Sequence, residues 1–328
     1  MSSIHKGDRD LKNRPLLKVV MKSLKFWVCC FITIATAIGL SYWLKNPMDE
    51  LNKGIPVIKL VQETVYEEKD GEALRTYHDL VLDIGPYGLA KFTVSLPEKI
   101  PEGGLPTALV VNGLDTGRKC LKLIQEHGNA ALIAFEYPSM LHKMKSIAAV
   151  FYFRSARRSA LAVPGQLVSI ARWAQEQSWH DKSPVSTIGF SLGAEFLPAA
   201  LHLACSEKVC LGPAVLAYGG AGLFSIFYAI PGHFLLKCLR AIGGAILFHP
   251  LEPEKHLPHI QGEFLLINGI YDQLIPLSAA KKMQELFPEP KTIINLETEH
   301  VKPNDPELLG KLIRIARDWL EEKREKGG

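Results

Sequence analysis

Six short, mostly apolar runs constrain the fold of this chain more than any other feature. They occupy residues 108–111, 130–135, 185–190, 214–218, 264–267 and 292–296. Runs of this kind are typical of strands buried on both faces, as in a parallel sheet. Helical patterns lie between them, and alternation of strand and helix predicts parallel strands joined by right-handed crossovers.

Three of the helical patterns are well marked. Pro164 is expected to open the first, because proline suits the first turn of a helix. Asp305 and Pro306 are expected to begin the last, as cap and first-turn residue. The apolar stripes consist of Leu167, Ile170, Ala171 and Ala174; of Ala279, Ala280, Met283, Leu286 and Phe287; and of Leu309, Leu312, Ile313, Ala316 and Leu320.

The segment before the first apolar run has a different character. Residues 57–67 and 74–84 flank Asp70-Gly71, which is a hairpin signal, and residues 89–96 alternate apolar with polar side chains. These patterns predict antiparallel strands with one solvated face. The expected fold class is therefore α/β, with a mostly parallel central sheet and an antiparallel N-terminal edge.

Chemically active side chains follow three of the apolar runs. Ser191 ends the run at 185–190 inside G-F-S-L-G, Asp272 follows 264–267, and His300 follows 292–296. Sites in such sheets form at the carboxyl ends of the strands. A serine hydroxyl needs a neutral imidazole to take its proton, and the imidazole needs a carboxylate to orient it. We therefore expect Ser191 as nucleophile, His300 as base and Asp272 as orienting acid, with Glu297 and Glu299 as alternative acids.

Acyl transfer to a serine also needs donors for the developing oxyanion. The backbone N–H of Leu192, directly after the nucleophile, and that of Leu114, in the turn after the first apolar run, are the candidates. Glu195, one turn into the following helix, is expected to place a favourable charge near the helix N-terminus.

With these residues in place, the chain resembles the α/β-hydrolase superfamily across roughly residues 57–322. The similar motifs are G-F-S-L-G at 189–193 (nucleophile elbow), N-G-L-D at 112–115 (oxyanion turn), D-Q-L-I-P at 272–276 (acid loop) and E-H-V at 299–301 (histidine loop). The chain order of Ser, acid and His agrees as well. Asn112 departs from the pattern, because many members have His there. The compact acid and histidine loops look most like dienelactone-hydrolase-type and related esterases.

The resemblance implies a serine hydrolase that cleaves carboxylic esters or thioesters through an acyl-enzyme and needs no cofactor. The same triad also serves acyltransferases and serine peptidases, and the fold also occurs in binding proteins without turnover. No competing chemistry is predicted, because the sequence lacks H-E-x-x-H spacing for a metal and lacks both G-x-G-x-x-G and P-loop patterns for a nucleotide.

The N-terminus combines a basic arm with an apolar segment. Residues 1–25 hold seven Lys and Arg against two Asp, so the formal charge of +4 is local to this arm and gives no support to nucleic-acid binding. Residues 26–44 are uncharged and about 28 Å long as a helix, enough to span a bilayer. We expect a signal-anchor with a cytoplasmic N-terminus and the domain on the exocytoplasmic side. The alternative is a cleaved signal peptide with Ala35 and Ala37 at its cleavage site, which gives a secreted or periplasmic protein.

The expected domain boundaries follow from this anchor. Residues 45–56 are expected as a linker and 57–328 as the hydrolase domain, with a possible lid insertion at 221–258. Within the insertion, residues 222–248 carry only Lys237 and Arg240 as full charges, and Pro231-Gly232 divides them into two pieces too short to span a membrane. These pieces are expected either to pack on the sheet or to form a lid that lines a pocket for a lipophilic acyl ester or touches the bilayer.

A second basic cluster precedes Pro164. It consists of Lys143, Lys145, Arg154, Arg157 and Arg158, around aromatic residues 151–153. Such a cluster either faces anionic headgroups or forms a solvated basic face.

Overall fold

The computed structural model describes residues 23–327, apart from 24, 25, 28, 31, 32, 35, 38, 42, 71, 72, 125, 126, 144–148 and 303. The chain divides into two units, residues 1–45 and residues 46–328. Most of the predicted basic arm, and six positions of the predicted anchor, lie outside the described residues. The described positions from 26 to 43 are helical. Among the residues that are described, no helix has both the length and the apolarity needed to cross a membrane.

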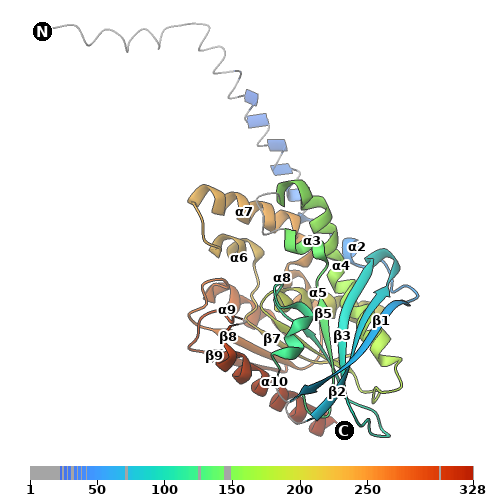
Figure 1. The fold of residues 1–328 in the computed structure, drawn as a ribbon. Helices are drawn as coiled ribbons and strands as arrows, with labels where there is room; N and C mark the ends of the chain where they lie inside the picture. The colour runs from blue at the N-terminus through green and yellow to red at the C-terminus, as the bar shows by residue number, and fades with distance from the viewer. Residues whose placement is uncertain are drawn as a thin grey trace, which may run out of the picture. The chain divides into compact units, whose positions relative to one another are not determined.

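A single sheet organises the second unit (Figure 1). Its strands are β1 (Lys59–Asp70), β2 (Ala73–Asp83), β3 (Leu89–Pro97), β4 (Thr107–Val111), β5 (Ala131–Glu136), β6 (Val185–Phe190), β7 (Leu211–Ala217), β8 (Phe264–Gly269) and β9 (Lys291–Leu296). Their order is β1-β2-β3-β5-β4-β6-β7-β8-β9. The pairs from β1 to β5 are antiparallel and the pairs from β5 to β9 are parallel. The mostly parallel sheet with an antiparallel N-terminal edge is therefore confirmed.

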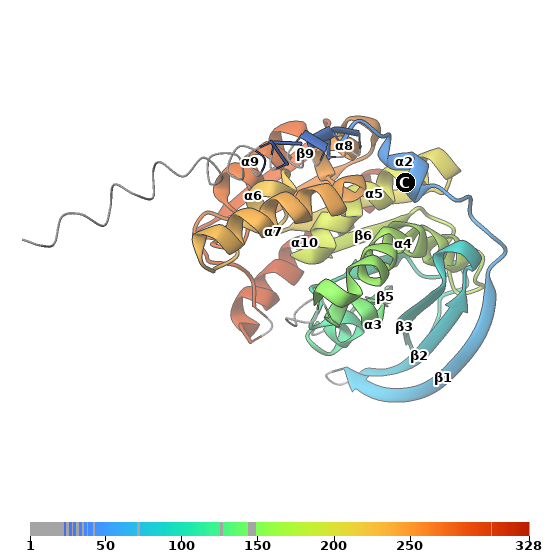
Figure 2. The same cartoon turned by 90° about the horizontal axis from the view of Figure 1, so that it is seen from above.

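Helices cover both faces of the sheet. They are α2 (Pro47–Leu51), α3 (Ser139–His142), α4 (Ala149–Gln175), α5 (Leu192–Glu207), α6 (Leu223–Ala229), α7 (Phe234–Leu247), α8 (Pro253–His256), α9 (Leu277–Leu286) and α10 (Pro306–Gly327), with short 3-10 turns η2 (Gly85–Tyr87), η3 (Gly117–Lys122), η5 (His249–Leu251) and η6 (Leu257–His259). Figure 2 shows β1, β2 and β3 curling away from the helices.

The period of two along each strand divides the core between these faces. On β4, Leu109 and Val111 pack into the cluster that contains α4 and α5. The residues between them, Ala108 and Val110, pack into the cluster that contains α10. This double burial is why the central strands read as continuous apolar runs in the sequence.

The prediction that Pro164 opens a helix is wrong. Pro164 lies inside the 27-residue helix α4, which begins at Ala149. The helix continues through the proline because its buried stripe extends on both sides, with Ala156 and Ala160 before it and Leu167 after it, all almost fully buried. Burial of that stripe offsets the hydrogen bond that a proline removes from the helix.

The ends of the domain also differ from expectation. The segment predicted as a linker contributes α2 to the compact unit, because the Asn46 side chain accepts the Met48 N–H at 3.0 Å and Leu51 is fully buried. At the other end, β9 was expected to be buried on both faces. Among the described strands it is the one at this edge and pairs with β8 alone, so Ile293 stays 42% exposed.

Candidate active site

Ser191 occupies the single position between β6 and α5. Its backbone angles are φ 53° and ψ −117°, a conformation that non-glycine residues rarely adopt. The Ser191 N–H donates to the Ala217 carbonyl of the neighbouring strand at 2.8 Å, which holds the turn in this state. Backbone strain of this kind persists only where the surroundings enforce it, and it concentrates at functional sites.

The glycines on both sides make this turn possible. A Cβ at Gly193 would lie 1.8 Å from the Val111 carbonyl oxygen, and one at Gly189 would lie 2.7 Å from Leu197 Cδ1. Real Cβ atoms do not approach neighbours so closely. The motif G-F-S-L-G therefore meets the steric needs of a strand-to-helix elbow, as its sequence predicts.

The structure brings together the three side chains that the sequence singled out. Ser191 Oγ lies 2.8 Å from His300 Nε2, and His300 Nδ1 lies 2.6 Å from Asp272 Oδ2. The Asp272 side chain is 2% exposed and the His300 side chain 10% exposed. Such a chain of hydrogen bonds can draw the proton from a serine hydroxyl and hold the resulting imidazolium beside a carboxylate.

Backbone donors fix the carboxylate in this arrangement. Asp272 Oδ1 accepts the N–H groups of Leu274 at 2.8 Å and Ile275 at 2.9 Å, which leaves Oδ2 for His300. The alternative acids lie elsewhere, since Glu297 and Glu299 are both exposed. Asp272 is therefore the carboxylate in contact with the imidazole.

Tyr218, which the sequence interpretation did not single out, supports the histidine loop. Its ring meets the His300 ring edge to face at 5.6 Å between centroids, and its hydroxyl lies 2.6 Å from Thr298 Oγ1. Burial raises the pKa of the Tyr218 hydroxyl, so it stays protonated. The sequence feature that could have identified Tyr218 is its position at the end of an apolar run, at the same sheet edge as Ser191.

The two candidate oxyanion donors lie at the same edge of the sheet. Leu192 is the first residue of α5, where the N–H groups of a helix have no partner within the helix. Leu114 lies in the turn after β4, whose last residue Val111 pairs with Gly189 beside the elbow. Asn112 shapes this turn, because its Oδ1 accepts the Gly113 N–H at 2.6 Å.

Two buried glutamates complete the surroundings. Glu195 was expected to carry a charge near a helix end, but that prediction is wrong. Its side chain is buried, its Oε1 accepts the Gly220 N–H at 2.8 Å, and burial raises the pKa of this carboxyl group well above its ordinary value, which disfavours the charge. Glu252 accepts the N–H groups of Gly222 and Leu223, both at 2.7 Å, and thereby fixes the start of α6.

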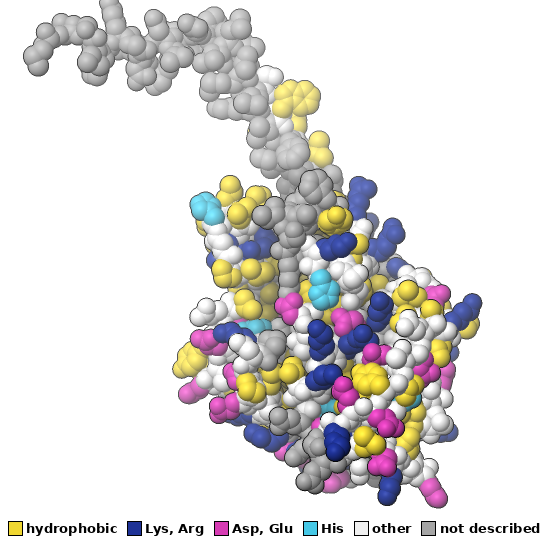
Figure 3. Space-filling model, viewed as in Figure 1, with side chains coloured by type: hydrophobic (Ala, Val, Ile, Leu, Met, Phe, Trp, Pro, Cys, Tyr) yellow, Lys and Arg dark blue, Asp and Glu magenta, His cyan; other side chains and the backbone are white. Residues whose placement is uncertain are grey.

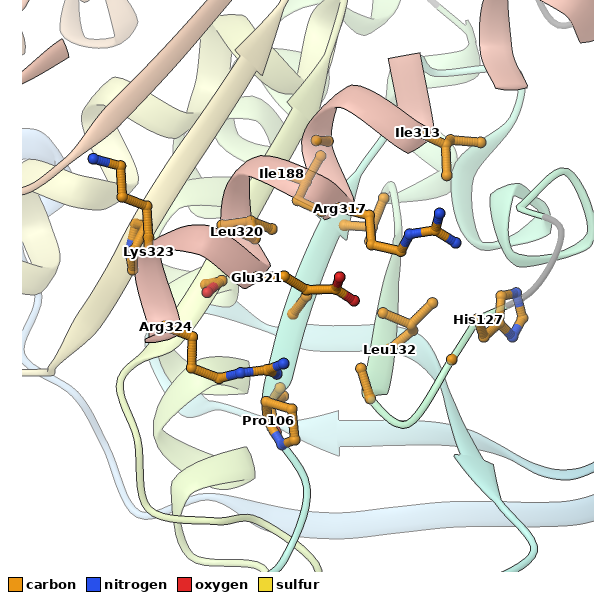
Figure 4. Close-up of a pocket in the computed structure, with 18 of the residues that line it drawn as sticks. Pro106, His127, Leu132, Ile188, Ile313, Arg317, Leu320, Glu321, Lys323 and Arg324 are labelled. Carbon is orange, nitrogen blue, oxygen red and sulfur yellow. The ribbon is translucent and has the colours of Figure 1, made fainter. Parts of the chain in front are cut away.

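A cavity of about 790 Å³ lies away from this site, between α10 and the sheet. Figure 4 shows Arg317, Glu321 and Arg324 of α10 around this space, with Leu132 and Ile188 on the sheet side. None of the three hydrogen-bonded side chains of the candidate site lines it. Within the described part of the chain, no group of three or more His, Cys, Asp or Glu residues is arranged to hold a metal ion.

No protein-family model and no curated protein sequence matches the chain. Solved structures do match. An acetyl xylan esterase from Paenibacillus sp. R4 has a TM-score of 0.55 at 15% identity, over 84% of this chain and 93% of that one. A putative dienelactone hydrolase from Klebsiella pneumoniae has a TM-score of 0.51 at 18% identity, over 80% and 97%. Carboxyl esterase 2 from Tuber melanosporum has a TM-score of 0.50 at 18% identity, over 74% and 82%.

These three proteins share one architecture, the α/β-hydrolase fold. Identities this low carry information about fold and not about substrate. The strand order, the elbow at Ser191 and the superpositions agree with one another. The chain therefore adopts the α/β-hydrolase fold that its motifs predicted.

Proposed function

We propose that this protein is a membrane-anchored serine hydrolase that cleaves carboxylic esters or thioesters through an acyl-enzyme on Ser191. The observation that carries the proposal is the hydrogen-bonded chain from Ser191 through His300 to Asp272, with the serine on a strained elbow. The esterase and hydrolase names of the structural neighbours support the same general activity.

In the first half of the proposed reaction, His300 Nε2 takes the hydroxyl proton as Ser191 Oγ attacks the substrate carbonyl carbon. The N–H groups of Leu192 and Leu114 stabilise the resulting oxyanion. His300 then gives the proton to the leaving alkoxide or thiolate, which departs as an alcohol or thiol. The acyl group remains on Ser191 as an ester.

In the second half, His300 removes a proton from water, and the hydroxide oxygen attacks the acyl carbonyl. Collapse of this intermediate breaks the bond to Ser191 Oγ, which takes its proton back from His300. The products are the carboxylic acid and the free enzyme. Asp272 stays ionised and stabilises the imidazolium in both halves.

The proposed location joins this chemistry to a membrane. Residues 26–44 are proposed to anchor the protein, with residues 1–25 cytoplasmic and the catalytic domain on the exocytoplasmic side. The hairpin α6–α7, which we call the cap, stands beside the acid loop, since Ile226 of α6 packs against the cluster of Ile275, Ala279 and Ala280. An apolar cap next to the proposed acid, on a chain with an apolar anchor, favours lipophilic acyl esters as substrates.

Hydrolysis of p-nitrophenyl acetate, butyrate, octanoate and laurate by the full-length protein tests the proposal. We expect turnover of all four esters, higher kcat/KM for the longer chains, and complete loss of turnover in the Ser191→Ala variant. Turnover that survives this substitution would exclude the acyl-enzyme. Flat rates beyond acetate would exclude the lipophilic substrate class while leaving the hydrolase intact.

An alkaline phosphatase fusion at the C-terminus tests the proposed orientation. The enzyme is active only outside the cytoplasm, so we expect activity from the fusion in intact cells. An inactive alkaline phosphatase fusion, together with an active fusion to a reporter that works only in the cytoplasm, would reverse the orientation.

A further inference from the structure

The α6–α7 hairpin presents an unusually apolar surface to the outside. Six of its large apolar side chains are at least 50% exposed: Phe224, Phe234, Leu235, Leu236, Leu239 and Ile242. Scattered exposed apolar residues are ordinary on a soluble domain, but a contiguous group on one short hairpin marks an interaction surface.

The exposure belongs to an ordered helix. Ala241 and Ala245 of α7 are buried, while Leu235, Leu239 and Ile242 recur at helical spacing along a separate, exposed stripe of the same helix. Phe227 of α6 packs so closely that a Cβ at Gly244 would lie 2.5 Å from its ring. The helix therefore has one face packed on its own hairpin and one apolar face without cover from the described residues.

Arg240 further fixes the hairpin. Its guanidinium Nε donates to the Phe227 carbonyl at 3.0 Å, and another of its nitrogens donates to the Ile230 carbonyl. Both carbonyls lie at the end of α6, so this cation caps α6 from within α7. These hydrogen bonds hold α7 against α6, while the leucine side chains of α7 remain exposed.

Aromatic and basic side chains lie at the start of α4, which contacts the end of α7. Tyr152 and Phe153 are about 40% exposed, with Lys143 over the Tyr152 ring at 5.1 Å and Arg154 over the Phe153 ring at 5.9 Å. Arg157 joins α4 to the end of α7, because its Nε donates to the Leu247 carbonyl at 2.8 Å. Figure 1 shows α7 and the start of α4 at the same end of the domain, and Figure 3 shows the apolar side chains gathered there.

The chain also enters the domain at this end. The second nitrogen of the Arg157 guanidinium pairs with Glu50 of α2 at 2.7 Å. Helix α2 begins at Pro47, three residues after Leu44, the last residue of the proposed anchor. Three residues of extended chain reach at most about 11 Å. The stretch of chain between the proposed anchor and α2 is therefore short.

We propose that the surface formed by Phe234, Leu235, Leu236, Leu239 and Ile242, with the basic start of α4, docks on an anionic lipid bilayer. Outward leucines with aromatic and cationic neighbours are the composition of helices that lie in the membrane interface. The inference rests on the proposed anchor and deepens the proposed function. In this proposal the α6–α7 cap, which lies beside the acid loop, contacts the lipid, and an acyl substrate reaches Ser191 from the bilayer.

The rate at which a maleimide labels the native thiol of Cys238 measures the accessibility of this surface, so no cysteine needs to be introduced. Cys238 lies three residues after Leu235 and four before Ile242, and it is partly exposed, while Cys205 and Cys210 on the rest of the domain are exposed. The full-length protein is reconstituted in liposomes of phosphatidylcholine with phosphatidylglycerol and treated with a membrane-impermeant maleimide. Peptide mass spectrometry then gives the Cys238 rate relative to Cys205, which normalises for orientation.

Three matched proteins are compared in the same liposomes. Leu235→Gln with Leu236→Gln and Leu239→Gln removes the apolar surface, since glutamine keeps helix propensity. The control changes three equally exposed apolar residues on the antiparallel edge: Leu60→Gln, Val61→Gln and Leu89→Gln. We expect the Cys238 rate to rise at least about tenfold in the α7 variant and to stay low in the wild type and in the control.

Equal Cys238 rates in all three proteins would overturn the docking proposal. Equal protection of Cys238 in pure phosphatidylcholine liposomes would also overturn it, because the lipid charge would then play no part. Protection of Cys238 that depends on protein density would do the same, because it indicates contact with a second copy of the chain. Hydrolysis of p-nitrophenyl acetate by the same samples is read separately, and its absence in the wild type would refute the hydrolase instead. Extraction of the wild type by carbonate would refute the anchor.

Discussion

Replacement of Asp272 by asparagine separates the electrostatic role of this residue from its structural one. Asp272 Oδ1 accepts two backbone N–H groups, and Oδ2 accepts the proton on His300 Nδ1 at 2.6 Å. In the Asp272→Asn variant the amide oxygen can keep both backbone hydrogen bonds. The NH₂ group then faces Nδ1, which must become an acceptor. The proton moves to Nε2, and the imidazole can no longer take the proton of Ser191.

The structure sets the size of this effect. If the asparagine amide rotates so that its oxygen faces His300 Nδ1, the correct tautomer of the imidazole is restored. That rotation leaves the N–H groups of Leu274 and Ile275 without an acceptor, at a cost of about 1 kcal/mol or more each. A total of about 2 kcal/mol leaves only a few per cent of molecules flipped. Loss of the carboxylate charge beside the imidazolium lowers the rate further. We expect kcat/KM to fall by about 10³- to 10⁴-fold, equivalent to about 4 to 5.5 kcal/mol.

Initial rates on p-nitrophenyl acetate, with a thermal melt of each protein, measure the two roles. The melting temperature of the Asp272→Asn variant should change little, because both backbone hydrogen bonds survive. Glu299→Gln, at the exposed alternative acid, should leave kcat/KM within about twofold of the wild type. A loss smaller than about tenfold in Asp272→Asn with an intact melt would refute the reasoning.

Three further predictions concern stability. Gly193→Ala should lower the free energy of unfolding by about 3 kcal/mol or more, since its Cβ would meet the Val111 carbonyl oxygen, while Gly243→Ala, with open space around it, should be neutral or stabilising; urea unfolding compares them. Burial lowers the pKa of His256 to about 4, so below pH 6.5 the unfolded chain binds a proton that the folded protein does not. The free energy of unfolding should therefore fall by about 3 kcal/mol between pH 7 and pH 4, and His256→Gln should reduce this fall. Burial raises the pKa of Glu195, so stability falls as pH rises above 4.5, and Glu195→Gln should stabilise the protein at pH 8 but not at pH 4, as read from urea midpoints.

Each of these has a clear contrary outcome. Equal stability of the two glycine variants would mean that the elbow relaxes without cost. A wild type and a His256→Gln variant with parallel pH profiles would show that this histidine titrates as in the unfolded chain. A Glu195→Gln effect independent of pH would show that the carboxyl group is ionised in the fold.

The sequence predicted that the side chains of Ser191, Asp272 and His300 lie together, because its signals are local. Ser191, Asp272 and His300 each follow directly after an apolar run, and parallel strands bring their carboxyl ends to one edge of the sheet. The elbow glycines are also local, because a strand-to-helix turn excludes a Cβ whatever the rest of the chain does. The cap of α10 was similarly predictable, and Asp305 Oδ1 accepts the Leu308 N–H at 3.0 Å.

The features that the sequence did not predict depend on packing between distant segments. Pro164 reads as a helix start, yet the apolar stripe of α4 continues through it and tertiary burial outweighs the local preference. The sequence predicts a surface charge at Glu195, but in the fold the side chain is buried and accepts a hydrogen bond from the Gly220 N–H. Glu252 and Tyr218 gain their partners only when the cap and the histidine loop fold over them.

Labelling of Ser191 tests the central claim most directly. The full-length protein is treated with a fluorophosphonate probe, and the modified peptide is identified by mass spectrometry. An activated serine with its base at 2.8 Å should react, so we expect a single adduct on Ser191, none in the Ser191→Ala variant, and much slower labelling in Asp272→Asn. A well-folded wild type that takes up no probe, or an adduct on another serine, would contradict the assignment of Ser191 as the nucleophile.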